Sequence, residues 1–307
     1  MIVVTAGNKY LDIDAYASCV AYVKLLKSRG EDAVFASSAT PNSSVSSIVR
    51  KYDHMIRTDY VPTSSDEFIV LDVSNPQFID KLVNQDKIVE IIDHHTGFES
   101  AWNKDGRTVQ IEFIGSVATI ILEKIIKEKQ IDVLDRDLCK LLLAAVLDNT
   151  LNLKGSITTK RDLQAYETLK RIGCIDKSFE EEYFMSCQKE INDDVVGSIK
   201  KDVKIETVAD LLPSIFGQLT LYDTKPIFDR KAEICEFFKE FNQPWILNVI
   251  CIKDGKSYII SSEDAMANIQ TLFNKKFNND VLILSKYMLR KEIMKMAREK
   301  CAVKFEM

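Results

Sequence analysis

The residues best suited to chemistry in this sequence are aspartates that stand where apolar runs end. Four such runs in the first half of the chain lead into or end near aspartate. These aspartates are Asp12, Asp14, Asp72, Asp93 and Asp148. Two of the chain's three histidines, His94 and His95, directly follow the fourth of them. Carboxylates crowded at one rim raise one another's pKa and need cations to neutralise them. The pattern indicates a divalent-metal site, and mixed carboxylate and imidazole ligands suit Mn²⁺ better than a thiolate-preferring metal.

Each of these aspartates also has a structural interpretation. Asp12 or Asp14 fits the N-cap of a following helix. Asp72 fits ordinary loop chemistry at a strand end, and Asp148 fits a turn at a helix terminus. The third histidine, His54, has no comparable neighbours, and we interpret it as a surface or structural residue. The coincidence of four acidic ends, with paired histidines at one of them, favours the metal site.

A parallel sheet would bring these residues together, because ligands bind beyond the carboxyl ends of parallel strands. Apolar strand-like runs alternate with helical patterns in the first half, which is typical of a parallel sheet covered on both faces. The strand-like runs are 2–5, 33–36, 68–71 and 88–92, and the helical ones are 15–26, 117–126 and 138–147. The fold class is therefore predicted to be α/β.

The second part of the chain has the pattern of a smaller α/β domain. The polar, acidic stretch between about 173 and 193 loses the earlier rhythm, and we place the domain connection there. We expect residues 1–178 to form the metal-binding catalytic domain and residues 190–307 to form the second domain. In the latter, the strand-like runs are 218–222, 245–252 and 257–260, and the helical patterns are 230–241, 264–273 and 291–300.

Composition limits the classes of protein to which this chain can belong. Its 307 residues suffice for two domains, and 46% hydrophobic with 28% charged residues is typical of a soluble globular protein. The net charge of -5 argues against binding of duplex nucleic acid, which needs a broad basic surface. The seven cysteines lack CxxC spacing, so neither a zinc knuckle nor a redox pair is indicated. The N-terminal apolar run is too short for a membrane span and lacks a cleavage signature, so we expect a cytoplasmic protein.

Several segments resemble a known family. Residues 12–15, Asp72, residues 93–95 and Asp148 resemble the four sequential motifs of the DHH phosphoesterase superfamily. Family II manganese-dependent inorganic pyrophosphatases have segments similar to 115–119, 148–159, 201–204 and 289–293. Glycine and asparagine at 7–8 are similar to exopolyphosphatases and prune-type proteins of the same superfamily. The resemblance implies a second domain of the DHHA2 type and an active site in the cleft between the two domains.

The resemblance also implies roles for individual residues around two divalent ions, Mn²⁺ or Mg²⁺, that activate a water molecule. Asp72 would bridge the two ions, and Asp12 would bind the first. The ligands implied for the second are Asp14, His94 and Asp148. His95 would contact phosphate and assist proton transfer. The other residues implied to bind phosphate oxygens are Asn8 in the first domain and Lys204, Arg290 and Lys291 in the second.

Three positions depart from the pyrophosphatase pattern. Asn8 replaces a histidine ligand, and because an amide oxygen binds transition metals less well than imidazole does, the first metal site should be weaker. Val73 replaces a polar residue, and Leu289 replaces a serine. These departures put pyrophosphatase-level efficiency in question.

From the motifs we expect hydrolysis of phosphoanhydride bonds in pyrophosphate or polyphosphate. Two alternatives stay open. One is a DHH-family phosphodiesterase that acts on nucleotides, and the other is a weakly active or non-catalytic regulatory homologue. We expect a monomer or homodimer whose partner is a small phosphate or polyphosphate substrate, without a membrane partner.

Overall fold

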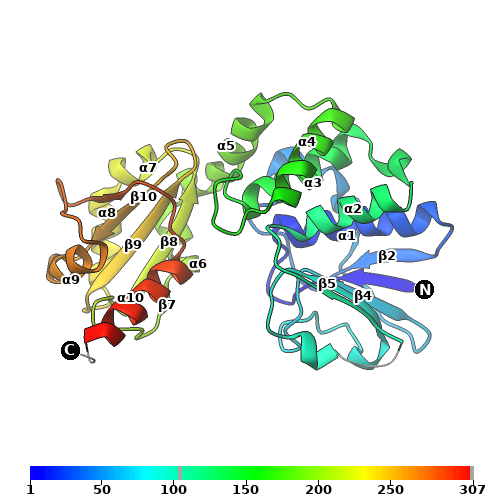
Figure 1. Ribbon diagram of the computed structural model, residues 1–307, viewed down its shortest axis with the longest axis horizontal. Helices are drawn as coiled ribbons and strands as arrows, with labels where there is room; N and C mark the ends of the chain where they lie inside the picture. The colour runs from blue at the N-terminus through cyan, green and yellow to red at the C-terminus, as the bar shows by residue number, and fades with distance from the viewer. Residues whose placement is uncertain (103–105, 305–307) are drawn as a thin grey trace. The chain divides into compact units, whose positions relative to one another are not determined.

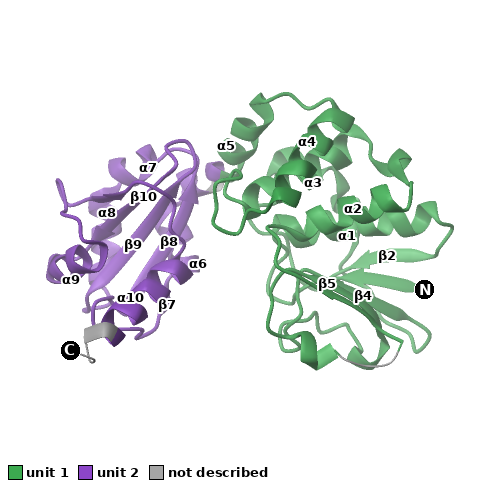
Figure 2. Cartoon of the chain, viewed as in Figure 1, with its two compact units in different colours: residues 1–187 green, residues 188–307 purple. Residues whose placement is uncertain are grey.

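The structure, a computed structural model, describes residues 1–102 and 106–304. Strands and helices alternate along the chain (Figure 1), which divides into two compact units, Met1–Cys187 and Gln188–Met307 (Figure 2). Each unit has its own sheet and its own hydrophobic core. The α/β class predicted from the sequence is confirmed. Among the described helices, none is long and apolar enough to cross a membrane.

The first unit is built on a six-stranded sheet with the order β3-β2-β1-β4-β5-β6, and every neighbouring pair in it is parallel. The strands are β1 (Ile2–Thr5), β2 (Ala33–Ala36), β3 (Ile56–Arg57), β4 (Glu67–Leu71), β5 (Ile88–Asp93) and β6 (Thr108–Ile111). The apolar runs predicted β1, β2, β4 and β5. The sequence analysis did not find β3 and β6, because they are short and only partly buried and so lack a continuous apolar run.

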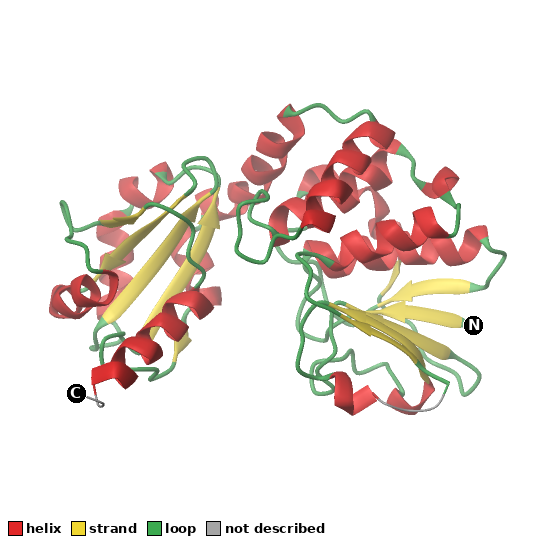
Figure 3. Cartoon of the chain, viewed as in Figure 1, coloured by secondary structure: helices red, strands yellow, loops and turns green. Residues whose placement is uncertain are grey.

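Helices cover one face of this sheet, and mainly loops cover the other (Figure 3). Helices α1 (Ile13–Ser28) and α2 (Val117–Lys127) lie against the strands, and α3 (Arg136–Asn149) and α4 (Lys160–Gly173) pack on these two helices. On the loop-covered face, Val73, Ile79 and Trp102 pack against strand residues such as Phe68 and Ile91. The expectation of a sheet covered on both faces is met, with loops in the place of helices on one side.

The acidic stretch in which we placed the domain connection is largely helical. Helix α5 spans Ser178–Asp193, and the boundary between the two compact units falls inside it. Its apolar positions Phe179, Tyr183 and Phe184 are buried, although acidic residues surround them in the sequence. The helix therefore belongs mostly to the first unit and continues into the second.

The second unit contains a mixed five-stranded sheet with the order β11-β10-β9-β8-β7, in which only β8 and β9 are parallel. The strands are β7 (Lys204–Ile205), β8 (Ile215–Leu221), β9 (Trp245–Cys251), β10 (Lys256–Ser261) and β11 (Leu282–Leu284). The helices are α6 (Val195–Asp202), α7 (Lys225–Asp229), α8 (Lys231–Lys239), α9 (Glu263–Phe273) and α10 (Arg290–Lys304). Two hydrophobic clusters flank the sheet, one beneath α6 and α8 and the other beneath α9 and α10.

Candidate metal centre

The carboxyl ends of β4 and β5 bring four polar side chains together. Asp72 follows β4, and Asp93 ends β5 and leads into His94 and His95. One possible ligand atom from each of these four residues lies within 4.8 Å of the others. The Nε2 atom of His94 is 3.4 Å from Oδ1 of Asp72, and Nδ1 of His95 is 4.0 Å from the same oxygen. Such a set of carboxylate and imidazole groups suits Mn²⁺ and related ions.

Asp72 has the features expected of a residue whose partner is a cation. Its Oδ1 atom is buried, and within the described part of the chain it has no hydrogen-bond partner. Burial, together with the charges of Asp12 and Asp14, raises the pKa of Asp72 well above its ordinary value. Its φ angle of 60° lies in the left-handed region, where strain is common at functional sites. A buried carboxylate oxygen that accepts no hydrogen bond is costly, and a bound cation would remove that cost.

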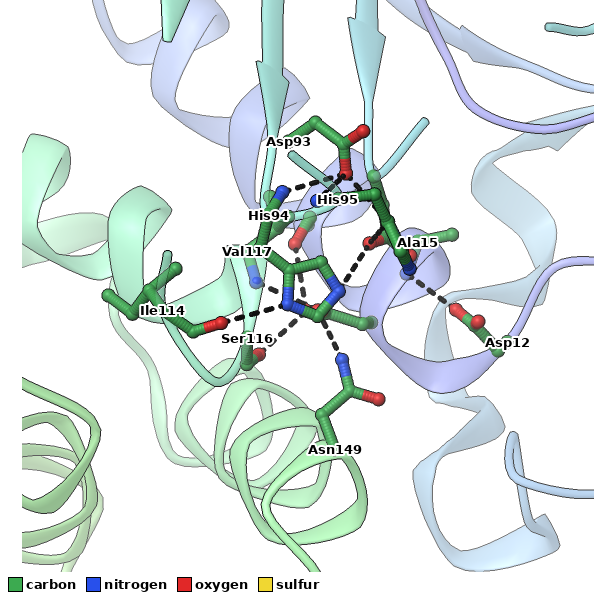
Figure 4. Close-up of polar contacts among 12 residues, drawn as sticks. Asp12, Ala15, Asp93, His94, His95, Ile114, Ser116, Val117 and Asn149 are labelled. Atoms are coloured by element: carbon green, nitrogen blue, oxygen red, sulfur yellow. Dashed lines mark hydrogen bonds and ion pairs between the residues drawn. The ribbon is translucent and has the colours of Figure 1, made fainter. Parts of the chain in front are cut away.

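The two histidines have different surroundings. The Nδ1 atom of His94 is 3.0 Å from the carbonyl oxygen of Ile114 (Figure 4). This contact leaves Nε2 for Asp72, whose Oδ1 lies 3.4 Å away. Metal-binding histidines commonly use their second nitrogen in this way. The His95 side chain is 62% exposed, and its Nδ1 is 2.8 Å from Oδ1 of Asp93. A hydrogen bond with Asp93 raises the pKa of His95. His94 thus fits a ligand, and His95 fits a group that meets substrate.

Asp14 is fully buried and holds the start of α2. Ser116 Oγ and the backbone amides of Val117 and Ala118 each donate a 2.8 Å hydrogen bond to its carboxylate. Asn149 Nδ2 donates another at 2.5 Å (Figure 4). Burial raises the pKa of Asp14, and the neighbouring His94 opposes that shift. Ser18 Oγ donates a longer hydrogen bond to Asp14 at 3.5 Å, so Oδ1 accepts three hydrogen bonds and Oδ2 accepts two.

Asp12 and Asp148 lie near this group without joining the four closest residues. Asp12 is the N-cap of α1, as one structural interpretation predicted, because its Oδ1 accepts the backbone amide of Ala15 at 2.9 Å. Asp148, at the end of α3, accepts the hydroxyl of Tyr183 at 3.1 Å. Burial raises the pKa of Asp148 to about 7, and the charges of Asp12 and Asp14 act in the same direction. Of the expected ligands, the structure brings Asp72 and His94 into the closest group.

Asn8 is held by the loop that follows β4. Its backbone amide donates to the carbonyl oxygen of Phe78 at 2.8 Å, and its side-chain amide donates to that of Gln77 at 3.2 Å. The loops after β1 and β4 therefore meet at the edge of the sheet that carries Asp72. Val73, the other departure in this part of the chain, packs into the hydrophobic core.

The three cations expected from the second unit differ in exposure. Lys204 in β7 and Lys291 in the first turn of α10 are exposed. Arg290 is 8% exposed. Its Nη1 donates to the carbonyl oxygens of Asp202 and Phe216 at 2.9 and 2.8 Å, and its Nη2 donates to Oδ1 of Asp202 at 2.8 Å. The Arg290 guanidinium therefore joins α6, β8 and α10.

Replacing Arg290 by lysine should destabilise the second unit. A lysine ammonium keeps the charge but lacks the planar fork that reaches three acceptors. We expect the free energy of unfolding to fall by about 2–4 kcal/mol, measured by urea denaturation followed by circular dichroism. Arg298→Lys on the same helix is the matched control, since Arg298 is 59% exposed, and it should change stability by less than about 0.5 kcal/mol. An Arg290→Lys protein as stable as the control would contradict this role.

Sequence reasoning gave no site role to several residues that shape this centre. They are Ser116, Asn149, Asp162 and Tyr183. Ser116 caps α2, and Thr159 with Asp162 forms a capping box at α4. Both have the sequence pattern of a helix start, so that signal could have located them. The contact of Tyr183 with Asp148 joins positions 35 residues apart, and no local pattern predicts it.

Comparison with known proteins relates the chain to one family. Residues 2–146 match the DHH family, N-terminal domain. The manganese-dependent inorganic pyrophosphatase of Bacillus subtilis (strain 168) is 26% identical over 300 residues, which cover 93% of this chain and 94% of the relative.

Two solved structures share the fold. A Methanococcus jannaschii protein, provisionally assigned as a family II inorganic pyrophosphatase, aligns over 97% of this chain and 99% of its own with a TM-score of 0.64 and 21% identity. An exopolyphosphatase-related protein from Bacteroides fragilis aligns over 99% and 92% with a TM-score of 0.54 and 14% identity.

Proposed function

Because this chain is a DHH family protein, related to manganese-dependent inorganic pyrophosphatases and exopolyphosphatase-related proteins, we propose that it is a metal-dependent phosphohydrolase that cleaves phosphoanhydride bonds. Its substrates would be pyrophosphate or polyphosphate. One observation carries the proposal. The buried Oδ1 atom of Asp72 accepts no hydrogen bond and lies 3.4 Å from Nε2 of His94, at the carboxyl edge of a parallel sheet.

The residues present fit a divalent ion. Asp72 and His94 would form the centre of the site, and further oxygen ligands would come from Asp12, Asp14 and Asp148. A Mn²⁺ or Mg²⁺ ion held by these residues would lower the pKa of a water molecule and so supply the nucleophile for hydrolysis. Asp14 also keeps the start of α2 in place through the hydrogen bonds that Ser116, Val117 and Ala118 donate to it. Asn8 stands where relatives of the pyrophosphatase type have histidine, so the first of two metal sites would be the weaker.

His95 would donate a proton to the phosphate, and the cations of the second unit would bind its oxygens. Asp93 holds the His95 ring and favours its protonated form, which can donate a proton to a phosphate oxygen. Lys204 and Lys291 are exposed and would neutralise phosphate charge. Arg290 would contact phosphate only by releasing Asp202, and otherwise it supports the helix turn that carries Lys291.

Phosphate release tests this function directly. Purified protein stripped of metal is given Mn²⁺ or Mg²⁺ and then pyrophosphate, tripolyphosphate, long polyphosphate or a panel of nucleotides. We expect metal-dependent release from at least one of the three phosphoanhydride substrates. His94→Ala should abolish that release, whereas His54→Ala, which changes an exposed histidine outside the site, should not. Release from nucleotides alone would support the phosphodiesterase alternative and contradict the proposal.

A second candidate function is binding without turnover. One observation favours it, because Asp202 and Phe216 already engage the Arg290 guanidinium that a phosphate would need. Binding of Mn²⁺ without hydrolysis of any substrate in the panel would favour this candidate over the hydrolase.

A further inference from the structure

A tyrosine hydroxyl on α5 reaches the candidate metal centre from outside the motifs. Tyr183 is fully buried, and its ring packs edge-on against Phe184 and stacks with Phe179. Its hydroxyl oxygen is 3.1 Å from Oδ1 of Asp148 and 3.0 Å from the carbonyl oxygen of Ser44. One buried oxygen atom therefore joins α5, the end of α3 and the loop that follows β2.

Counting hydrogens assigns the direction of these contacts. A tyrosine hydroxyl has one hydrogen, and the Ser44 carbonyl can only accept. Cys187 lies one turn further along α5, and its Sγ atom is 3.6 Å from the same Ser44 carbonyl. An ionised Asp148 also can only accept. Both of these acceptors, Oδ1 of Asp148 and the carbonyl oxygen of Ser44, receive a hydrogen when Tyr183 donates to Asp148 and the thiol of Cys187 donates to Ser44.

Ser44 extends this network to the residues at the start of α1. Its Oγ accepts the backbone amide of Ile13 at 2.9 Å, and Ile13 stands between Asp12 and Asp14. The Ser44 backbone is fixed in turn by Asn42, whose Oδ1 accepts its amide at 2.9 Å. Through Ser44 and Tyr183, the carboxylates of α1 and α3 are thus held in one hydrogen-bonded frame.

We propose that Tyr183 is a positioning residue. It fixes the Asp148 carboxylate relative to the carboxylates at the start of α1, so that these carboxylates can bind a divalent cation together. The proposal rests on the metal site of the proposed function. With Oδ1 held by the hydroxyl, rotation of the carboxylate is restricted and the direction of its second oxygen is fixed. Partners that orient metal ligands in this way typically affect metal affinity strongly.

The test is Mn²⁺ binding by the full-length Tyr183→Phe protein, because this change removes the hydroxyl and keeps the ring. Free Mn²⁺ is measured by electron paramagnetic resonance, and pyrophosphate hydrolysis is followed at rising Mn²⁺. We expect Mn²⁺ affinity to fall roughly 10- to 100-fold. Hydrolysis should be restored, at least in part, at high Mn²⁺. A purely structural role would not give rescue by the metal.

Tyr166→Phe is the matched control. Its hydroxyl hydrogen-bonds to Glu180 and so joins α4 to the same helix α5 without reaching the metal centre. We expect its Mn²⁺ affinity to stay within about twofold of the wild type. Equal Mn²⁺ affinity in the wild type, Tyr183→Phe and Tyr166→Phe would overturn the inference, and equal losses in both variants would overturn it as well.

If the Tyr183→Phe protein does not fold, two variants of Cys187 provide an independent test. Cys187→Ser keeps a donor for the Ser44 carbonyl, whereas Cys187→Ala leaves that carbonyl to compete for the Tyr183 hydrogen. We expect several-fold weaker Mn²⁺ binding in Cys187→Ala than in Cys187→Ser, and equal affinities would count against the assignment.

These outcomes also separate this inference from the proposed function. Wild-type protein that binds Mn²⁺ but hydrolyses no phosphate substrate would contradict the hydrolase and leave the Tyr183 comparison valid, because its readout is Mn²⁺ binding. Wild-type protein without measurable Mn²⁺ binding would contradict both.

Discussion

Asp72→Asn is expected to lower the proposed Mn²⁺-dependent pyrophosphate hydrolysis by roughly 10³-fold or more, because it removes the central charged ligand of the proposed metal site. The metal-free variant should be at least as stable as the wild type. Burial and the charges of neighbouring aspartates raise the pKa of Asp72. Asparagine at this position removes one of these mutually repelling carboxylates. Asparagine also tolerates the left-handed conformation that Asp72 adopts with φ of 60°.

Activity at saturating Mn²⁺ and thermal unfolding without metal are the two measurements. Asp132→Asn is the control for the loss of one charge, since Asp132 is exposed in the short helix after α2, and it should leave both quantities unchanged. Near-normal turnover in Asp72→Asn would exclude Asp72 as a metal ligand. A marked loss of metal-free stability would show that its carboxylate has a structural partner.

Asp162→Ala should cost about 3–5 kcal/mol of unfolding free energy, since it removes a buried charge that satisfies several donors. Asp162 is fully buried. It accepts hydrogen bonds from the amide of Gly115 at 3.0 Å and from the hydroxyl of Thr119 at 2.7 Å. The amide and hydroxyl of Thr159 each donate another at 2.8 Å. The alanine leaves these donors unsatisfied in a site that water does not reach.

Urea denaturation measures this effect. Asp137→Ala is the matched control, because it also removes an aspartate from a first helical turn, but Asp137 is 42% exposed and pairs with Lys51 at the surface. It should cost less than about 1 kcal/mol. Similar stabilities for the two variants would contradict the role of Asp162. Because Gly115 and Thr119 flank the amides that hold Asp14, we also expect Asp162→Ala to weaken Mn²⁺ binding.

The strands that carry the site could be predicted because they are buried on both faces. A strand buried on both sides needs a continuous run of apolar residues, and such runs predict β1, β4 and β5 from the sequence. Strand β3 has two residues, and β6 alternates polar and apolar residues at an edge of the sheet, so neither has that pattern. Helix α5 was missed because its acidic face dominates its composition, while a few aromatic positions anchor it.

The site could be predicted only as far as strand ends determine it. Neighbouring parallel strands end at the same edge, so Asp72 and His94 had to meet. What fills the lone pairs of each carboxylate depends on contacts between distant segments. Asp14 meets Ser116 across 102 residues, and Arg290 meets Asp202 across 88. Such pairings follow from tertiary packing, for which a single sequence has no periodic signal.

Helix α5 also limits how the chain could be divided or recombined. A fragment that ended at residue 178 would retain every DHH motif and yet lack Phe179, Tyr183 and Phe184, whose rings are buried in the first unit. An exchange of second domains between relatives would remove the same face if its junction lay at the start of α5. The junction should therefore lie beyond Tyr183, within the last turns of α5. The chimaera then keeps the Tyr183 hydroxyl that hydrogen-bonds to Asp148, whichever relative supplies the second domain.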